Sequence, residues 1–344
     1  MFKAHDLFRL AKNSLTYGIG NLVQRFLMIL LLPVYTRYLV PDDYAVVALL
    51  ALFSSVLGTI TLCALSNGIG RYFYYAAKEN TTLAHVVWSP FLFVLVFTSL
   101  VCLAFCPFLS PVSMFLLGSD RYSYLLGLSL LTLLFSNLAS IGRSVLVFKE
   151  QSVMVSILSV AQIPMGILAG LYFVVYLERG VTGLVEANLV TAIATCVVTL
   201  MVTVFRYRPS FSMAVLLKQL KYSYPLIGAV LAFWIIDLSD RYLLSLFLPM
   251  ADVGLYDIGY RMGLMMGLVV DGFSLAWPPY YHGHNQDGKG QSLCGPTLAV
   301  YMLVASVWCV ALSLACPLAL RILTTPGFYE AYTVVPWVAA ACLL

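Results

Sequence analysis

Charged side chains interrupt two long apolar stretches of this sequence, at residues 223–248 and 253–280. A charge inside a hydrocarbon layer costs at least ~2.5–3.5 kcal/mol, so such side chains are normally paired and face a polar cavity. Arginine there suits a phosphate group, because its planar fork donates two parallel hydrogen bonds, and a carboxylate can balance that charge or carry protons. The charged residues are Asp237, Asp240 and Arg241 in the first stretch and Asp257, Arg261 and Asp271 in the second.

Two acid–arginine pairs are four residues apart, Asp237 with Arg241 and Asp257 with Arg261. On a helix this spacing places both side chains on one face, one turn apart. Asp240 is next to Arg241, so it is expected to point elsewhere and to partner a neighbouring span. Two interpretations stay open. Either the pairs neutralise each other and hold helices together, or their arginines line a hydrated cavity that binds an anionic group.

Arg25 has no acidic residue three or four positions away, although it lies about eleven residues into an apolar stretch at 14–38. It therefore needs an acid on another span, a water-filled cavity or an anionic ligand. Asp271 is a candidate partner for Arg25 or a proton site, and Glu186 is a candidate coupling group or an interfacial side chain. The predicted substrate-binding residues are Arg25, Arg241 and Arg261, and those predicted for charge balance or ion coupling are Asp237, Asp240, Asp257, Asp271 and Glu186.

The elements that position these residues are expected to be membrane-spanning helices. Of the 344 residues, 62% are hydrophobic and 10% are charged, with a mean hydropathy of +0.94, whereas a soluble domain has about 25% charged residues. The apolar stretches are far longer than the ~10-residue alternating strands of a β-barrel. We predict an all-α polytopic membrane protein with a polar loop at 67–83, a break at Pro164 and spans at about 14–38, 44–66, 84–109, 122–147, 152–177, 180–205, 223–248, 253–280, 292–320 and from 333 onward.

A shift of 209 residues aligns Ser14 with Ser223 and the acidic turn at 42–43 with residues 251–252. Shared constraints on hairpins could produce this match, or the chain could hold two related bundles of six helices. An even number of spans per bundle gives both the same orientation, related by a pseudo-twofold axis along the membrane normal. The expected domains are a six-span bundle at 1–205, a basic linker with an amphipathic helix at 206–222, and a second bundle at 223–344 that is incomplete in this chain.

The Lys and Arg residues predict the orientation in the membrane. With the N-terminus inside, the expected inner segments carry twelve Lys and Arg residues and the outer segments carry four. Positive residues collect on the cytoplasmic side, so this asymmetry favours a cytoplasmic N-terminus. The linker at 206–222 is then cytoplasmic, and its amphipathic helix is expected to lie on the membrane surface.

Known catalytic and metal-binding patterns are missing from the sequence. The eight cysteines form no Cys-x-x-Cys pair, and His282 and His284 supply only two ligands in a Gly-rich loop, which is too few for a metal site. We find no Gly-rich phosphate loop with Lys, no Gly-x-Ser-x-Gly and no His-Glu-x-x-His. The chain is therefore expected to be neither an enzyme nor an ATP-driven pump, with no cofactor, no metal and no nucleic-acid partner.

Three blocks of the sequence resemble the polysaccharide and oligosaccharide flippases of the multidrug/oligosaccharidyl-lipid/polysaccharide exporter superfamily. They are residues 13–44, with the Pro-Asp-Asp-Tyr turn, residues 240–281, with Asp-Arg and Val-Gly-Leu-Tyr, and residues 323–336. The family usually has Gly after the Pro-Asp-Asp-Tyr turn, where this chain has Ala45. The similarity extends over nearly the whole chain.

The resemblance implies transport of a polyprenyl-pyrophosphate-linked oligosaccharide from the inner to the outer leaflet of the plasma membrane, by alternating access. The glycan would be an O-antigen, capsule or exopolysaccharide repeat unit. Implied partners are this lipid-linked oligosaccharide, membrane lipids, and glycan polymerase or chain-length proteins. Two alternatives stay open. A cation-coupled drug exporter of the same superfamily should prefer an acidic cavity, and the mixed charge argues mildly against it; the other is a membrane scaffold for glycan assembly that transports nothing.

Overall fold

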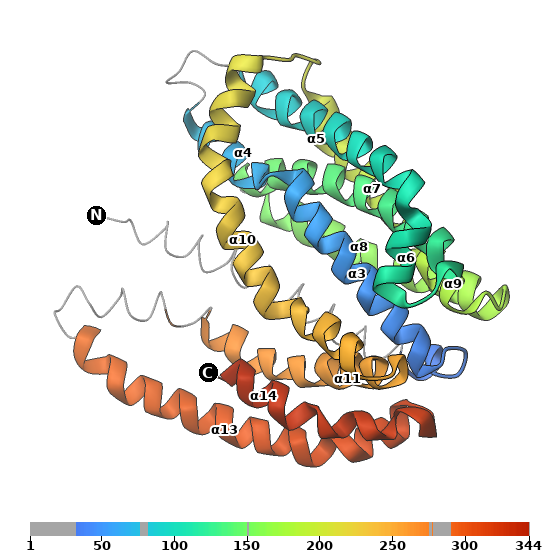
Figure 1. Ribbon diagram of the computed structural model, residues 1–344. Coiled ribbons are helices and arrows are strands. Elements are labelled where there is room, and N and C mark those ends of the chain that lie inside the picture. Colours follow the sequence, from blue (N-terminus) through green and yellow to red (C-terminus); the bar gives the residue numbers. More distant parts are fainter. Residues whose placement is uncertain (1–31, 76–81, 150, 275–276, 278–289, 344) are drawn as a thin grey trace. The chain divides into compact units, whose positions relative to one another are not determined.

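The computed structural model describes residues 32–75, 82–149, 151–274, 277 and 290–343, and the part of the chain that it describes is helical, without strands (Figure 1). A helix satisfies its backbone hydrogen bonds within one segment, as a lipid environment requires. The predicted all-α polytopic membrane class is confirmed. Seven helical segments within the described ranges are long and apolar enough to cross a membrane: Pro41–Phe73, Leu83–Leu117, Asp120–Phe148, Val153–Tyr176, Gly180–Arg206, Met250–Ser274 and Gly295–Leu323.

The chain packs as two compact units. Residues Val46–Pro249 form the first, which we call the large unit. The described parts of Met1–Ala45 and Met250–Leu344 form the second, the small unit. The domain boundaries expected from the sequence, at residues 205 and 223, stay a prediction.

The large unit is built around α7, which packs against α5, α9 and α4. Its core contains Val87, Phe91, Leu138, Ile141 and Cys196. Gly142 lets α7 approach α9 closely, because a Cβ there would lie 2.7 Å from Thr199 Cγ2. Helix α3 (Pro41–Leu62) belongs to this unit from Val46 onward. The other described α-helices of the unit are α4 (Leu65–Tyr75), α5 (Leu83–Phe105), α6 (Leu109–Leu117), α7 (Ser123–Phe148), α8 (Ser152–Gly170), α9 (Gly180–Val202) and α10 (Met213–Phe247).

The prediction of a polar loop at 67–83 is wrong in its first half, where the chain forms α4. Cys63 and Ala64 separate α3 from α4, and both adopt the left-handed backbone conformation, with φ of 50° and 51°. Side chains other than glycine disfavour this conformation, so two in succession make a sharp break rather than an extended loop. Helix α4 then buries Leu65 and Ile69 in the core. Asn67 and Arg71 stay exposed on its outer side, and this polar face is what suggested a loop.

The linker helix and the following span are one helix in the structure, α10, rather than two elements. The Ser212 hydroxyl caps its first turn by accepting a hydrogen bond from the backbone N–H of Val215. Gln219 is fully buried and donates to the carbonyl of Val86 at 3.1 Å. Lys218 and Lys221 are exposed, as expected for an amphipathic segment. Because this first part is packed against α4 and α5, the helix continues without interruption into the apolar stretch.

Proline bends helices here less than the sequence suggested. The expected break of the fifth span at Pro164 is wrong, since α8 continues through it to Gly170. The irregular segment comes later, as a π-helical turn at Leu171–Tyr176. A proline removes one backbone hydrogen bond, and neighbouring helices in a membrane protein can hold the helix together around it. Helix α8 packs against α9 along this length.

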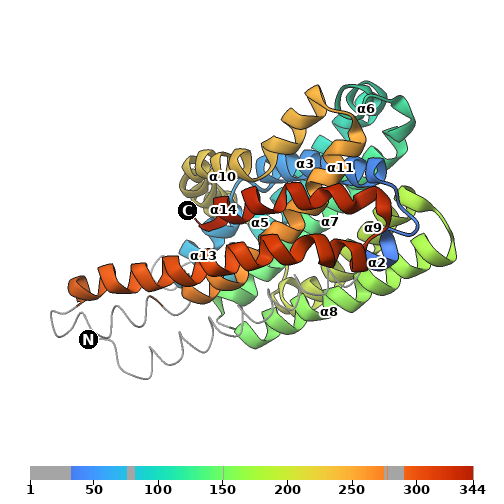
Figure 2. The same cartoon turned by 90° about the horizontal axis from the view of Figure 1, so that it is seen from below.

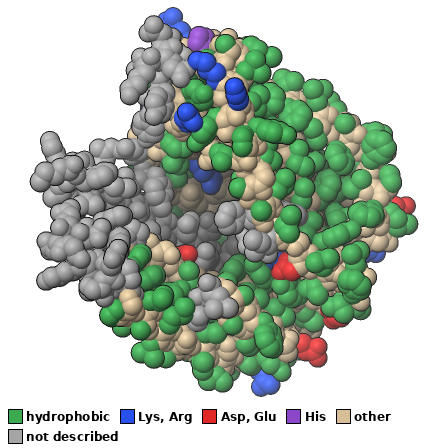
Figure 3. All heavy atoms as spheres, turned by 60° about the vertical axis from the view of Figure 1, so that its left-hand side comes forward, with side chains coloured by type: hydrophobic (Ala, Val, Ile, Leu, Met, Phe, Trp, Pro, Cys, Tyr) green, Lys and Arg blue, Asp and Glu red, His purple; other side chains and the backbone are tan. Residues whose placement is uncertain are grey.

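Basic side chains mark one end of the large unit. Arg71 of α4 lies over the ring of Tyr222 in α10, 4.5 Å from its centroid, and Lys149 lies 4.6 Å from the centroid of the Tyr207 ring. Figure 3 shows a face that is mostly hydrophobic, with Lys and Arg side chains gathered near one end. This arrangement fits the predicted cytoplasmic end, and the orientation itself stays a prediction.

The small unit is held together by close packing of α11 (Met250–Gly263). Gly259 faces the backbone of η6 (Pro326–Thr333), where a Cβ would lie 2.5 Å from the Ala331 carbonyl oxygen. Gly263 similarly faces Val338 of α14 (Val335–Leu343). Figures 1 and 2 both show α14 alongside α13 (Gly290–Leu323). The remaining described elements of this unit include α2 (Leu32–Tyr35) and the turn η5 (Leu264–Met266).

Candidate functional site

The Asp257–Arg261 pair predicted from its four-residue spacing is confirmed in α11. Arg261 Nε donates to Asp257 Oδ2 at 2.7 Å. The carboxylate is buried, with 5% of its side chain exposed, whereas 43% of the Arg261 side chain is exposed. Within the described residues, Arg261 has no other hydrogen-bond or ion-pair partner. Its two terminal nitrogens can therefore donate to an anionic group while Nε holds the carboxylate.

A buried tyrosine hydroxyl lies in the same unit, at Tyr44 of the Pro-Asp-Asp-Tyr turn. Its side chain is 3% exposed, and its hydroxyl has no hydrogen-bond partner among the described residues. The ring packs edge-on against Phe328, with centroids 5.4 Å apart. Sequence reasoning did not single out this hydroxyl, because a tyrosine that follows an acidic turn usually reaches the interface with water.

Asp240 and Arg241 contact each other in α10, so the expectation that Asp240 points away is wrong. Arg241 Nη1 donates to Asp240 Oδ1 at 3.1 Å, and the Arg241 backbone N–H donates to the same oxygen at 2.8 Å. The long arginine side chain folds back to reach its neighbour's carboxylate, which helical spacing alone does not show. Only 5% of the Arg241 side chain is exposed. Asp237 lies on the same helix, but its side chain is outside the described part, so its pairing with Arg241 stays a prediction.

Glu186 of α9 is paired with Arg179, which directly precedes that helix. Arg179 Nη1 lies 2.7 Å and 2.9 Å from the two carboxylate oxygens, and 12% of the Glu186 side chain is exposed. The hydrogen bond to Glu186 and its negative charge raise the pKa of Arg179. The Glu186 carboxylate is thus balanced by the arginine that precedes its own helix, and its interfacial position stays a prediction. Its role in ion coupling stays a prediction.

Other predicted residues fall partly outside the described structure. Arg25 lies outside the described residues, as do His282 and His284. Asp271 is half-buried in the helical segment that follows α11. The predicted pairing of Arg25 with Asp271 stays a prediction.

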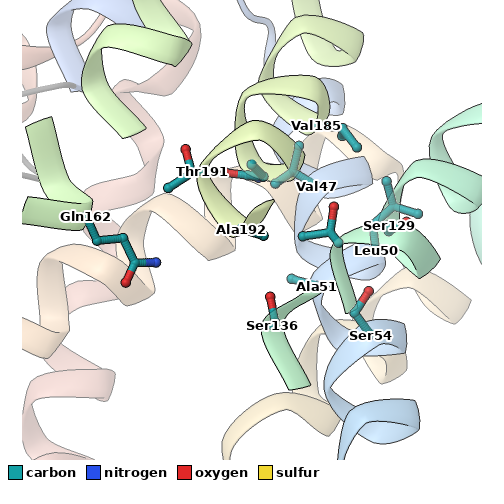
Figure 4. A pocket seen from close by; sticks show the side chains of 12 residues that line it. Val47, Leu50, Ala51, Ser54, Ser129, Ser136, Gln162, Val185, Thr191 and Ala192 are labelled. Carbon is teal, nitrogen blue, oxygen red and sulfur yellow. The ribbon is translucent and has the colours of Figure 1, made fainter. Parts of the chain in front are cut away.

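A pocket of about 280 Å³ opens within the large unit, between α3, α7, α8 and α9 (Figure 4). None of its lining side chains is charged, and seven of the twelve carry a hydroxyl or an amide. No spacing pattern in the sequence indicates this pocket, because its walls come from four different helices. Its polar lining includes Ser54 of α3, Thr132 and Ser136 of α7, Gln162 of α8, and Asn188 and Thr191 of α9.

Arg143 is a further cationic residue, which is counted among the twelve inner Lys and Arg residues although it falls within the span predicted at about 122–147. The structure places it inside α7, five residues before the helix ends at Phe148, where its side chain is half-buried. Its Nη2 donates to Gln162 Oε1 at 3.2 Å. The described part of the chain offers it no carboxylate within ion-pair distance. The signal that could have revealed it is the predicted span itself, which continues past the arginine to about residue 147.

Comparison with known proteins identifies a family and an individual relative. The sequence model of a family described as "Polysaccharide biosynthesis protein" matches residues 34–273. The chain is 21% identical over 280 residues to "Lsg locus putative protein 1" of Haemophilus influenzae. The alignment covers 79% of this chain and 65% of that protein, so the chain spans less than two thirds of its relative's length.

Solved structures share the fold at low sequence identity. An inward-facing multidrug resistance MATE family transporter of the MOP superfamily is 13% identical, with a TM-score of 0.70 over 95% of this chain and 83% of its own. The MATE multidrug transporter DinF-BH, solved in complex with a bound compound, is 14% identical, with a TM-score of 0.65 over 97% of this chain and 81% of its own. A MOP superfamily transporter from Pyrococcus furiosus, described as having a binding pocket of reverse polarity, is 15% identical. Its TM-score is 0.63 over 96% of this chain and 76% of its own. At these identities the likeness shows the fold alone.

Proposed function

This chain belongs to a family of polysaccharide biosynthesis proteins, and from that premise we propose that it moves a polyprenyl-diphosphate-linked oligosaccharide from the inner to the outer leaflet of a membrane. The family match confirms the resemblance seen in the sequence, and the fold is that of MOP superfamily transporters. A protein of this family with this fold that carries arginine in its membrane-spanning helices is suited to a substrate that joins a glycan to an anionic diphosphate.

Arg261 is the observation that carries this proposal. Its partner Asp257 is buried, while nearly half of the arginine side chain is exposed and its terminal nitrogens are open to a second partner. An arginine fork binds phosphate oxygens through charge-assisted hydrogen bonds. A pair that served only to hold helices together would have no need of an exposed guanidinium. Arg25 and Arg241 are the other proposed head-group ligands, and Asp237, Asp240, Asp257, Asp271 and Glu186 are proposed to balance charge or to couple transport to ions.

The proposed mechanism is alternating access. The diphosphate and the sugars enter the polar interior from the cytoplasmic side, while the polyprenyl tail stays in the bilayer. A transporter of this kind is not an enzyme and needs no cofactor. We place it in the plasma membrane with its N-terminus in the cytoplasm, where glycan polymerase or chain-length proteins are its proposed partners.

Export of a cationic drug is the second candidate function. It is favoured by the fold, which the chain shares with multidrug transporters, including one solved with a bound compound. A cationic drug needs unpaired carboxylates or aromatic faces in its site. The lining of the described pocket has neither, and Arg261 adds a positive charge to the small unit.

Reconstitution of the full-length protein in proteoliposomes tests the proposal. The substrate is labelled lipid-linked oligosaccharide extracted from the native host. We expect the wild type to translocate it and Arg261→Gln to be at least about tenfold slower, since a charge-assisted hydrogen bond contributes roughly 1.5–3 kcal/mol. Arg321→Gln is the matched control, because Arg321 is exposed at the end of α13.

The double variant Asp257→Asn/Arg261→Gln separates binding from structural support. It restores a neutral hydrogen-bonding pair, so it should fold as the wild type does and still fail to transport. Recovery of transport in this double variant would show that the pair only holds helices together. A wild type that moves cationic dyes along an ion gradient, but no lipid-linked glycan, would establish the drug-exporter function instead.

A further inference from the structure

Arg143 is a cation in a membrane-spanning helix whose hydrogen-bond partner is neutral. An arginine offers five N–H donors, and the bond to Gln162 uses one of them. In the small unit, by contrast, Arg261 has a carboxylate on its own helix. A half-buried guanidinium without a carboxylate keeps its full positive charge and most of its donors, which makes it a binding group for an anion.

Arg143 lies on the face of α7 that lines the pocket. Ser129 and Ser136, both lining residues, precede it by fourteen and seven residues. Seven residues are nearly two full turns, so these three side chains differ by only ~20° per step around the helix. The rise between Ser136 and Arg143 is about 10 Å. Gln162 joins the two features, because its side chain lines the pocket (Figure 4) and also accepts the hydrogen bond from Arg143.

The pocket offers neutral donors and acceptors. In the described ranges, the side chains of Ser54, Ser136 and Asn188 have no hydrogen-bond partner within the protein. Thr132 and Thr191 donate to backbone carbonyls of their own helices, at 2.9 Å and 2.7 Å, which leaves their oxygen lone pairs free to accept. A mixture of unused donors and acceptors without charge suits the hydroxyl and amide groups of a sugar.

The size of the pocket limits what it can hold. About 280 Å³ lies just below the ~300–1,000 Å³ typical of pockets for drug-sized ligands. It therefore suits a single sugar unit rather than a whole oligosaccharide. Its lining has no aromatic ring and no carboxylate, so a cationic aromatic drug would find no matching group there.

We propose that Arg143 and this pocket form one two-part site in the large unit, in which Arg143 binds the diphosphate of a lipid-linked glycan and the pocket binds the sugar attached to it. This inference rests on the proposed function. The predicted orientation puts the Arg143 end of α7 toward the cytoplasm, at the depth of the inner-leaflet head groups. The polyprenyl tail can then stay in the bilayer while the first sugar reaches toward the pocket.

Binding to the full-length protein in nanodiscs tests the site with two probes. One is undecaprenyl diphosphate, which has no sugar, and the other is lipid-linked oligosaccharide extracted from the native host. We expect Arg143→Gln to weaken the binding of both probes by about tenfold or more, since it removes a charge-assisted contact to the group they share. Arg143→Lys keeps the charge without the fork and should weaken both by less.

The pocket is tested by the double variant Ser136→Ala/Asn188→Ala. It should weaken the binding of the glycan-bearing probe by about tenfold, because two hydrogen bonds to the sugar are lost. The binding of undecaprenyl diphosphate should stay unchanged. The matched control is Ser66→Ala/Asn67→Ala, which removes the same groups from α4, away from the pocket. Thermal unfolding of each variant identifies any that misfolds. If Arg143→Gln misfolds, the binding measured for Arg143→Lys and for the pocket variant decides whether the site exists.

The outcomes distinguish this site from the proposed function. If the wild type binds neither probe, the proposed function is wrong and the site falls with it. If the wild type binds both probes and the pocket variant binds both as tightly, the sugar subsite is wrong while the function stands. Equal weakening of both probes by the pocket variant also overturns the subsite, because it would show a general disturbance rather than contact with a sugar.

Discussion

Arg261 in the small unit shares a face of α11 with the carboxylate that it binds, whereas Arg143 in the large unit is held across two helices by the amide of Gln162. The first arrangement is neutral before any ligand arrives. The second keeps a net positive charge next to an uncharged pocket. A paired arginine can support the fold and still bind a ligand, whereas Arg143, which meets no carboxylate among the described residues, has a charge that an anionic ligand could balance. The proposals above therefore assign both tasks to α11 and ligand binding to α7.

The largest expected effect comes from removing the carboxylate in α11. Asp257→Asn should destabilise the protein by roughly 1–3 kcal/mol, because it leaves Arg261 without its counter-charge, although the exposure of Arg261 moderates the loss. Thermal or denaturant unfolding in detergent measures this change. The double variant Asp257→Asn/Arg261→Gln should regain most of the loss, and a double variant as unstable as the single one would contradict the pairing argument.

Gln162→Glu converts the large-unit arrangement into the small-unit one. The new carboxylate would pair with Arg143 and compete with an anionic ligand, so binding of undecaprenyl diphosphate should weaken by about tenfold, or ~1.4 kcal/mol. Unfolding without ligand should show equal or higher stability. Gln151→Glu is the matched control, because Gln151 is exposed before α8 begins. Unchanged or tighter binding by Gln162→Glu would argue against Arg143 as the anion ligand.

Arg143→Gln should leave the stability of the ligand-free protein unchanged to within about 1 kcal/mol, or raise it slightly. The reason is that the substitution removes a partly desolvated charge that no carboxylate in the described ranges balances. Unfolding of Arg143→Gln and Asp257→Asn, measured under the same conditions, compares the two changes in stability directly. A loss as large as that of Asp257→Asn would mean that the two arginines are held in the same way after all.

The smallest effect is expected at Arg179, half of whose side chain is exposed in its pair with Glu186. Arg179→Gln should produce no measurable change in the unfolding midpoint. Glu186 raises the pKa of Arg179, so any contribution of the pair through this group is present below the ordinary arginine pKa and is lost only as the pH rises through the raised pKa. Stability should therefore show no dependence on Arg179 between pH 5 and pH 9, which unfolding of wild type and variant across that range can test.

Features that depend on one helix were predictable from the sequence. The spans follow from long apolar stretches, and the Asp257–Arg261 contact follows from the geometry of a single turn. Asp240 was misjudged because side-chain flexibility, rather than helical position, brings it to Arg241. The helix α4 was missed because its polar outer face hides two buried apolar residues, Leu65 and Ile69.

Features that depend on contacts between helices were not predictable. Gln162 lies nineteen residues from Arg143 and on another helix, so no spacing rule connects them. The pocket has the same character, since its walls come from α3, α7, α8 and α9. Single-sequence reasoning located the charges of the small unit and overlooked the neutral pocket of the large unit, because uncharged serine and threonine are unremarkable in a membrane helix.

The position of Arg143 near the end of α7 also bears on how the protein is made. As α7 enters the bilayer, Arg143 has no carboxylate on its own helix to pair with, but it lies five residues from the helix end, where a long side chain can extend to the head groups. Its partner Gln162 is synthesised later, on α8. We expect the isolated α7 segment to insert less readily than the α7–α8 hairpin in an assay of translocon insertion, and Gln162→Leu to remove that advantage. The order of synthesis would then decide when the arginine becomes enclosed.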